Sequence, residues 1–132
     1  MRTYEKGVEE YIPETTDPDV QERIKELLEI LKEDVVVLGH HYQRDDVIGF
    51  ADHAGDSLIL SQKAAAEKKK HIVFCGVHFM AECADILTED DQQVYLPEKD
   101  AGCAMADMAV AQDVERIWEY LTKRTGKNII PV

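Results

Sequence analysis

Three groups of polar residues could bind a ligand or move a proton. The first is His40, His41 and Tyr42, since an imidazole titrates near neutral pH and a phenol donates a hydrogen bond to a developing oxyanion. The alternative is that these three are ordinary polar loop residues. A metal site built from His40, His41 and His53 is a third possibility, which we disfavour because adjacent histidines on an extended loop point apart.

The second group is Asp56 and Ser57, and the third is Cys103. Ser57 lies at an expected helix start, where free backbone N–H groups favour a carboxylate or phosphate, although Asp56 could simply cap that helix. Cys103 follows a glycine in an expected loop, so its thiol could ligate a metal, attack an electrophile or pack as a structural cysteine. Packing explains Cys75, in an expected strand, and Cys83, on an expected helix.

Alternating helix and strand patterns must position these groups. Helical spacing of apolar residues predicts helices within 18–31, 47–53, 57–70, 77–87 and 114–125, and short apolar runs predict strands at 35–38, 71–75, 94–96 and from 129 onward. This alternation predicts an α/β fold with a short parallel sheet between two helical layers, a three-layer αβα arrangement. We expect residues 1–132 to form a single α/β domain whose first 14 residues are a loose lead-in.

Loops after the expected strands hold the unusual residues. In an open parallel sheet, ligands bind beyond the carboxyl ends of the strands. The loops 40–46, 76–78 and 97–103 follow the first three expected strands. We therefore expect His40, Tyr42 and Cys103 to gather at one edge of the sheet.

Composition excludes several classes of protein. The net charge of the 132 residues is −12, which argues against nucleic-acid and anionic-membrane partners because both require a basic face. No apolar stretch approaches the roughly 18 residues of a membrane span, and the polar N-terminus carries no signal-peptide core. The three cysteines show no Cys-x-x-Cys spacing, so we expect no disulfide framework and a cytoplasmic location.

In combination, these motifs resemble quinolinate synthase. The matching strings are His-His-Tyr-Gln at 40–43, Gly-Asp-Ser-Leu at 55–58, Phe-Cys-Gly-Val-His-Phe-Met-Ala-Glu at 74–82 and Ala-Gly-Cys-Ala-Met-Ala-Asp-Met at 101–108. The resemblance runs from about Asp17 to Val132. It implies an enzyme of three similar α/β domains that condenses iminoaspartate with dihydroxyacetone phosphate to quinolinate, a precursor of NAD.

The resemblance also implies roles for particular residues. His40 and Ser57 match residues that hold the dicarboxylate substrate, and Tyr42 matches a tyrosine that assists proton transfers, which makes His40 and Tyr42 the expected catalytic residues. Cys103 matches the ligand that the first domain gives to a [4Fe-4S] cluster, whose fourth iron stays open to act as a Lewis acid.

One thiolate cannot hold a cubane cluster, so we expect this chain to be inactive alone. Its expected partners are the small-molecule substrates and either the missing domains or further copies of the chain. Two other functions stay open. One is a non-catalytic α/β binding module, and the other is a hydrolase with Cys103 as nucleophile and His40 or His78 as base.

Overall fold

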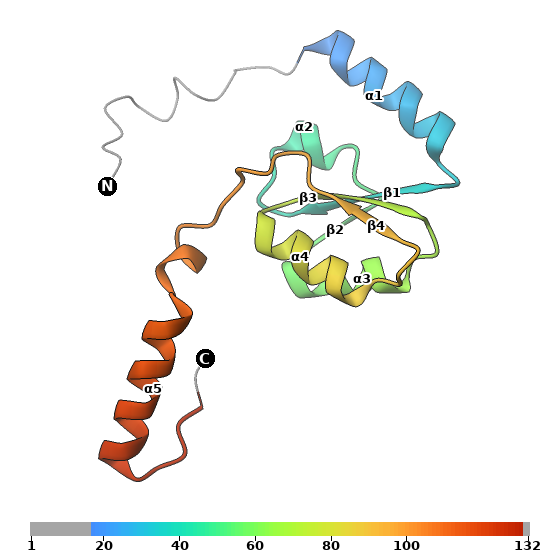
Figure 1. The fold of residues 1–132 in the computed structure, drawn as a ribbon. Coiled ribbons are helices and arrows are strands. Elements are labelled where there is room, and N and C mark those ends of the chain that lie inside the picture. Colours follow the sequence, from blue (N-terminus) through green and yellow to red (C-terminus); the bar gives the residue numbers. More distant parts are fainter. Residues whose placement is uncertain (1–16, 131–132) are drawn as a thin grey trace, which may run out of the picture.

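The structure, a computed structural model, describes residues 17–130 (Figure 1). Its elements are α1 (Pro18–Leu31), β1 (Val35–His40), α2 (Asp45–Ile48), β2 (His53–Gly55), α3 (Ser57–Ala66), β3 (His71–Cys75), α4 (His78–Leu87), β4 (Gln93–Tyr95), the 3-10 turn η2 (Ala106–Met108) and α5 (Ala111–Thr125). The expected lead-in at residues 1–14 lies outside this range. Within it, no helix is long and apolar enough to cross a membrane.

All strands run parallel in one sheet of order β2-β1-β3-β4. β1 lies in the middle, where its Val35 pairs with His71 of β3 and its Leu38 pairs with His53 of β2. Because the strands are parallel, their carboxyl ends meet at one edge of the sheet, as the sequence predicts. The expected α/β fold class is confirmed.

The core lies between the sheet and the pair α3–α4, which cover one face together (Figure 1). Its buried residues are Val36, Leu38, Leu60, Ala64, Ile72, Phe74, Met80, Ala81 and Ala84. β1 is buried along nearly its whole length, as expected for a central parallel strand. α2 lies on the other side of the sheet, in contact with β1, and α1 extends away from the sheet in Figure 1.

The sequence has a capping residue followed by a proline at 17–18 and a glycine at 126, which predict the start of the first helix and the end of the last one, and the structure confirms both. The Asp17 carboxylate accepts the Asp19 N–H at 2.9 Å and Pro18 begins α1. α5 ends at Gly126, whose φ of 63° is the left-handed conformation typical of a glycine after a helix.

β2 was not predicted, because residues 47–53 were expected to be helical. Asp52 explains the difference. Its carboxylate accepts the Val37 N–H and its own N–H donates to the Val37 carbonyl, both at 2.8 Å. These two bonds hold the chain beside β1, so α2 ends at Ile48 and residues 53–55 pair as a strand.

Three further expectations were wrong. α3 ends at Ala66, so the lysines at 68–70 lie in the following loop and not in its last turn. The apolar stripe at 18–31 is typical of a surface helix packed on a core, but α1 has no buried residue. Residues 128–130 form no strand, and the remainder of the strand expected from 129 onward lies outside the described residues. A strand requires a neighbour for its backbone groups, and no such neighbour lies beside these residues in the described chain.

Candidate functional site

The histidine–tyrosine cluster lies at the carboxyl end of β1. His40 is the last residue of this strand, not the first of a loop as expected, and its side chain is buried. The ring of His41 stacks on His40 with centroids 4.4 Å apart. The Tyr42 ring makes edge contacts with both imidazoles, at 4.6 and 4.4 Å, while remaining 81% exposed. A buried imidazole is therefore in contact with a phenol that faces solvent.

His41 ties this cluster to the end of β2. Its backbone N–H donates to the Gly55 carbonyl at 3.1 Å, and its ring Nδ1 lies 3.1 Å from the same oxygen. A carbonyl only accepts, so these partners assign the proton of His41 to Nδ1 and leave Nε2 with a free lone pair when the ring is neutral.

The opposite tautomer follows for His40. The Tyr42 backbone N–H donates to His40 Nδ1 at 3.3 Å, so this nitrogen is an acceptor and the neutral ring carries its proton on Nε2. Burial lowers the pKa of His40, the neighbouring His41 lowers it further, and Asp56 opposes both effects. Near neutral pH, His40 is therefore a neutral donor through Nε2–H.

Asp56 caps α3, which is the alternative to a binding role that the sequence left open for this residue. Its carboxylate accepts the Ile59 N–H at 3.0 Å. Ser57 is the first residue of α3, and its carbonyl accepts the Ser61 hydroxyl at 2.9 Å. Ser57 also lies at an apolar hollow of about 280 Å³ between α3 and α4, which is lined by Ser57, Leu58, Ser61, Phe79, Cys83, Ile86 and Leu87.

Cys103 is half-buried in the connection between β4 and η2. The His78 N–H donates to the Ala101 carbonyl at 2.9 Å and fixes this connection to the start of α4. The Cys103 carbonyl accepts the Asp107 N–H at 2.9 Å. Across the described residues, no hydrogen bond joins the Cys103 thiol to His40 or His78, the expected bases of a cysteine hydrolase.

The other two cysteines differ in environment. Cys75 is half-buried at the end of β3, and burial raises the pKa of its thiol. Cys83 is exposed on α4, so within this chain it does not pack in the core as expected.

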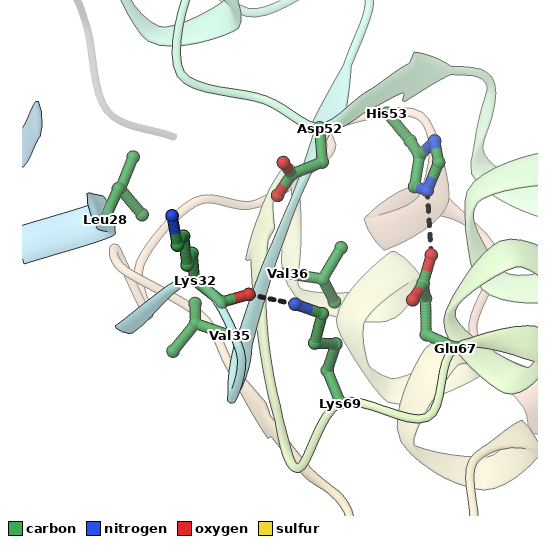
Figure 2. A pocket seen from close by; sticks show the side chains of 8 residues that line it. All are labelled: Leu28, Lys32, Val35, Val36, Asp52, His53, Glu67 and Lys69. Atoms are coloured by element: carbon green, nitrogen blue, oxygen red, sulfur yellow. Dashed lines mark hydrogen bonds and ion pairs between the residues drawn. The ribbon is translucent and has the colours of Figure 1, made fainter. Parts of the chain in front are cut away.

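The described residues bring no three histidine, cysteine or acidic side chains together as a metal site. His53, one member of the histidine-only alternative, begins β2 and pairs with Leu38, two residues before His40 on β1. There its Nε2 contacts Glu67 at 2.9 Å and its Nδ1 lies 3.4 Å from the Lys63 ammonium (Figure 2 draws the Glu67 contact). An ammonium only donates, so these contacts assign the His53 proton to Nε2.

The amino-terminal end of β1 borders a hollow of about 360 Å³ that no sequence motif indicated (Figure 2). It is lined by Leu28, Lys32, Val35, Val36, Asp52, His53, Glu67 and Lys69. Several of its polar groups already have partners, since Asp52 bonds to β1, Glu67 to His53, and the Lys69 ammonium to the Lys32 carbonyl. Asp52, Glu67 and Lys69 therefore serve to join neighbouring elements of the fold, and their contacts give no indication of a ligand in this hollow.

Comparison with known proteins decides the family. A sequence model of the quinolinate synthetase A protein family matches residues 22–129. This chain belongs to that family. Over 125 residues it is 54% identical to a quinolinate synthase from Bacillus cereus, 53% to one from Bacillus anthracis and 52% to one from Bacillus thuringiensis. Each match covers 94% of this chain but only 34% of the relative, so the chain spans about a third of the length of these curated relatives.

Proposed function

We propose that these residues form one of three similar domains of a cytoplasmic quinolinate synthase. The complete enzyme would condense iminoaspartate with dihydroxyacetone phosphate to quinolinate, in the biosynthesis of NAD. The observation that carries this proposal is the family match over residues 22–129, together with relatives that are named quinolinate synthase.

The cluster at the end of β1 supports a substrate-binding and proton-transfer role. A neutral His40 with its proton on Nε2 offers a hydrogen bond to a substrate carboxylate without a counter-charge. Tyr42 touches that ring and faces solvent, where it could donate a proton to an oxygen of a bound substrate. Ser57, at the first turn of α3, would add a hydroxyl at a helix N-terminus, whose dipole favours an anion, beside the Asp56 carboxylate that caps the Ile59 N–H.

Cys103 is our proposed ligand to a [4Fe-4S] cluster, which would supply an open iron as a Lewis acid. The described residues offer one such thiolate and no further ligands beside it, so they do not form a cluster site by themselves. The remaining ligands would come from the rest of the enzyme. An assembly of several copies that each donate Cys103 is the alternative, and it would lack the substrate contacts of the other domains.

The test is a hybrid enzyme, in which these 132 residues replace the matching third of the Bacillus cereus relative. We expect the hybrid to form quinolinate and the 132-residue chain alone to form none. In the hybrid, Ser57→Ala should mainly raise KM and Tyr42→Phe should mainly lower kcat. Tyr95→Phe is the matched control and should change neither, because Tyr95 lies on β4 and its hydroxyl contacts His71, the first residue of β3, at 3.0 Å. Quinolinate made by the short chain alone, or equal kinetics for Tyr42→Phe and Tyr95→Phe, would contradict the proposal.

A further inference from the structure

A single carbonyl oxygen joins the tip of β1 to the end of β2. The Gly55 carbonyl accepts the His41 backbone N–H at 3.1 Å and, at the same distance, the N–H of the His41 ring at Nδ1. A carbonyl oxygen has two lone pairs, so it can accept both bonds at once. Because Gly55 also pairs with His40 in the sheet, these bonds continue the ladder one residue beyond the end of β1.

β2 is short and lies at the edge of the described sheet, so few bonds hold it in place. It consists of His53–Gly55, and its neighbour in the sheet is β1. The two bonds between Asp52 and Val37 fix the segment before this strand. His41 fixes the other end. Both ends of β2 are therefore tied to β1 by side chains, one through a carboxylate and the other through an imidazole.

Ser57 follows Gly55 by two positions and begins α3. The residue between them is Asp56, whose carboxylate accepts the Ile59 N–H and whose carbonyl accepts the Leu60 N–H, both at 3.0 Å. These bonds fix Asp56 to the first turn of the helix, so the connection has little freedom of its own. A shift of the Gly55 carbonyl would therefore move the start of α3 and Ser57 with it.

The same imidazole supports the two rings beside it. It stacks on His40 with an angle of 27° between the ring planes, and it makes an edge contact with Tyr42. His41 is exposed, so packing in the core does not orient its ring. The bond from Nδ1 to the Gly55 carbonyl provides that orientation. A ring turned toward solvent would lose its contacts with both neighbours.

We infer that His41 is a positioning residue, whose bond to the Gly55 carbonyl holds Ser57 in place relative to His40 and Tyr42. His41 needs no contact with a substrate for this role, because it acts on the segment that carries Ser57. The inference rests on the substrate-binding role proposed above for Ser57. The bond itself can be tested independently of that role.

The tautomer of His41 tests the bond without an assay of activity. An imidazole in water favours the proton on Nε2, whereas this bond requires the proton on Nδ1. Proton–nitrogen correlation spectra of the 132-residue chain would be recorded well above the ordinary histidine pKa of about 6.5. We expect a protonated Nδ1 and an unprotonated Nε2 for His41. A proton on Nε2 would overturn the inference, even if the hybrid enzyme forms quinolinate.

Two amide substitutions separate the effect of the bond from that of the ring. In His41→Asn the amide nitrogen takes the position of Nδ1 and still donates to Gly55, whereas in His41→Gln it takes the position of Nε2, beyond that carbonyl. Both variants lose the ring and its stacking, so the difference between them reports the bond alone. In the hybrid enzyme we expect KM to be about fivefold higher for His41→Gln than for His41→Asn, as the loss of one ordinary hydrogen bond predicts, with similar kcat values. Equal KM values would overturn the inference.

A Ser57→Ala background shows whether His41 acts through Ser57. If His41 positions the Ser57 hydroxyl, removal of that hydroxyl should remove most of the difference between the two amide variants. We expect their KM ratio to fall below about twofold in this background, and an undiminished ratio would overturn the inference. A hybrid that forms no quinolinate even with His41 and Ser57 intact contradicts the proposed function instead. The tautomer of His41 would then decide the inference.

Discussion

Gly39→Ala tests how tightly the residue before His40 is packed. Gly39 lies in β1 between Ala54 of β2 and Cys75 of β3. A β-carbon at this position would lie 2.8 Å from Ile48 Cδ1 and 2.9 Å from Ala51 Cβ. The Ala51 methyl has no rotamer that moves it away, so α2 and the segment after it would have to shift.

The expected cost follows from these two contacts. Overpacking of this kind typically costs about 1–3 kcal/mol, and we expect Gly39→Ala to lower the free energy of unfolding by that amount. Ile48→Val removes the Cδ1 methyl and alone costs roughly 0.5–1.5 kcal/mol. In the presence of Gly39→Ala, the same deletion relieves one of the two contacts. The double variant should therefore lose less stability than the sum of the single losses, with a coupling of at least about 0.5 kcal/mol.

Urea unfolding followed by far-UV circular dichroism measures each free energy. Gly49→Ala is the matched control, since its β-carbon would meet only the Asp45 carbonyl oxygen, at 3.4 Å, and the φ of Gly49 is −58°. We expect it to change the stability by less than about 0.5 kcal/mol. The packing argument fails if Gly39→Ala behaves like this control, or if its cost adds to that of Ile48→Val without coupling.

Three other predictions concern the core, the pH response and the thiols. Phe74→Ala should cost about 3–5 kcal/mol because this ring is fully buried, and a loss below about 1 kcal/mol in urea unfolding would contradict that burial. Folding lowers the pKa of His40, so the stability that the neutral ring contributes is complete above the ordinary pKa of 6.5 and is lost as the pH falls through the folded value. Imidazole NMR should give a folded pKa below 6.5, and the pKa should fall further in Asp56→Asn because the Asp56 carboxylate raises it. An unshifted pKa would refute this. Iodoacetamide at pH 8 should label exposed Cys83 before Cys75, whose pKa burial raises, as peptide mass mapping would record; the reverse order would be contrary evidence.

Features that depend on neighbouring residues were predicted correctly from the sequence. The buried strands at 35–38 and 71–75, the cap at Asp17 and the stop at Gly126 are all set by residues within a few positions of each other. The edge at which His40 and Tyr42 lie follows from parallel pairing, which the alternation of elements predicts.

Features that depend on distant contacts were missed. β2 exists because Asp52 bonds to Val37, fifteen positions earlier, and no local pattern shows that bond. The link between His41 and the Gly55 carbonyl was missed for the same reason, since it requires β1 and β2 to be adjacent.

The central claim is that this chain contributes Cys103 to the iron–sulfur cluster of a quinolinate synthase. The direct measurement is iron and sulfide per chain in the hybrid enzyme after anaerobic reconstitution, in wild-type, Cys103→Ser and Cys83→Ser forms. Cys83→Ser is the matched control because this thiol is exposed on α4, away from the connection that holds Cys103. We expect one [4Fe-4S] cluster per chain in the wild type and in Cys83→Ser, and its loss in Cys103→Ser. A full cluster in Cys103→Ser, in a hybrid that folds and forms quinolinate, would contradict the account.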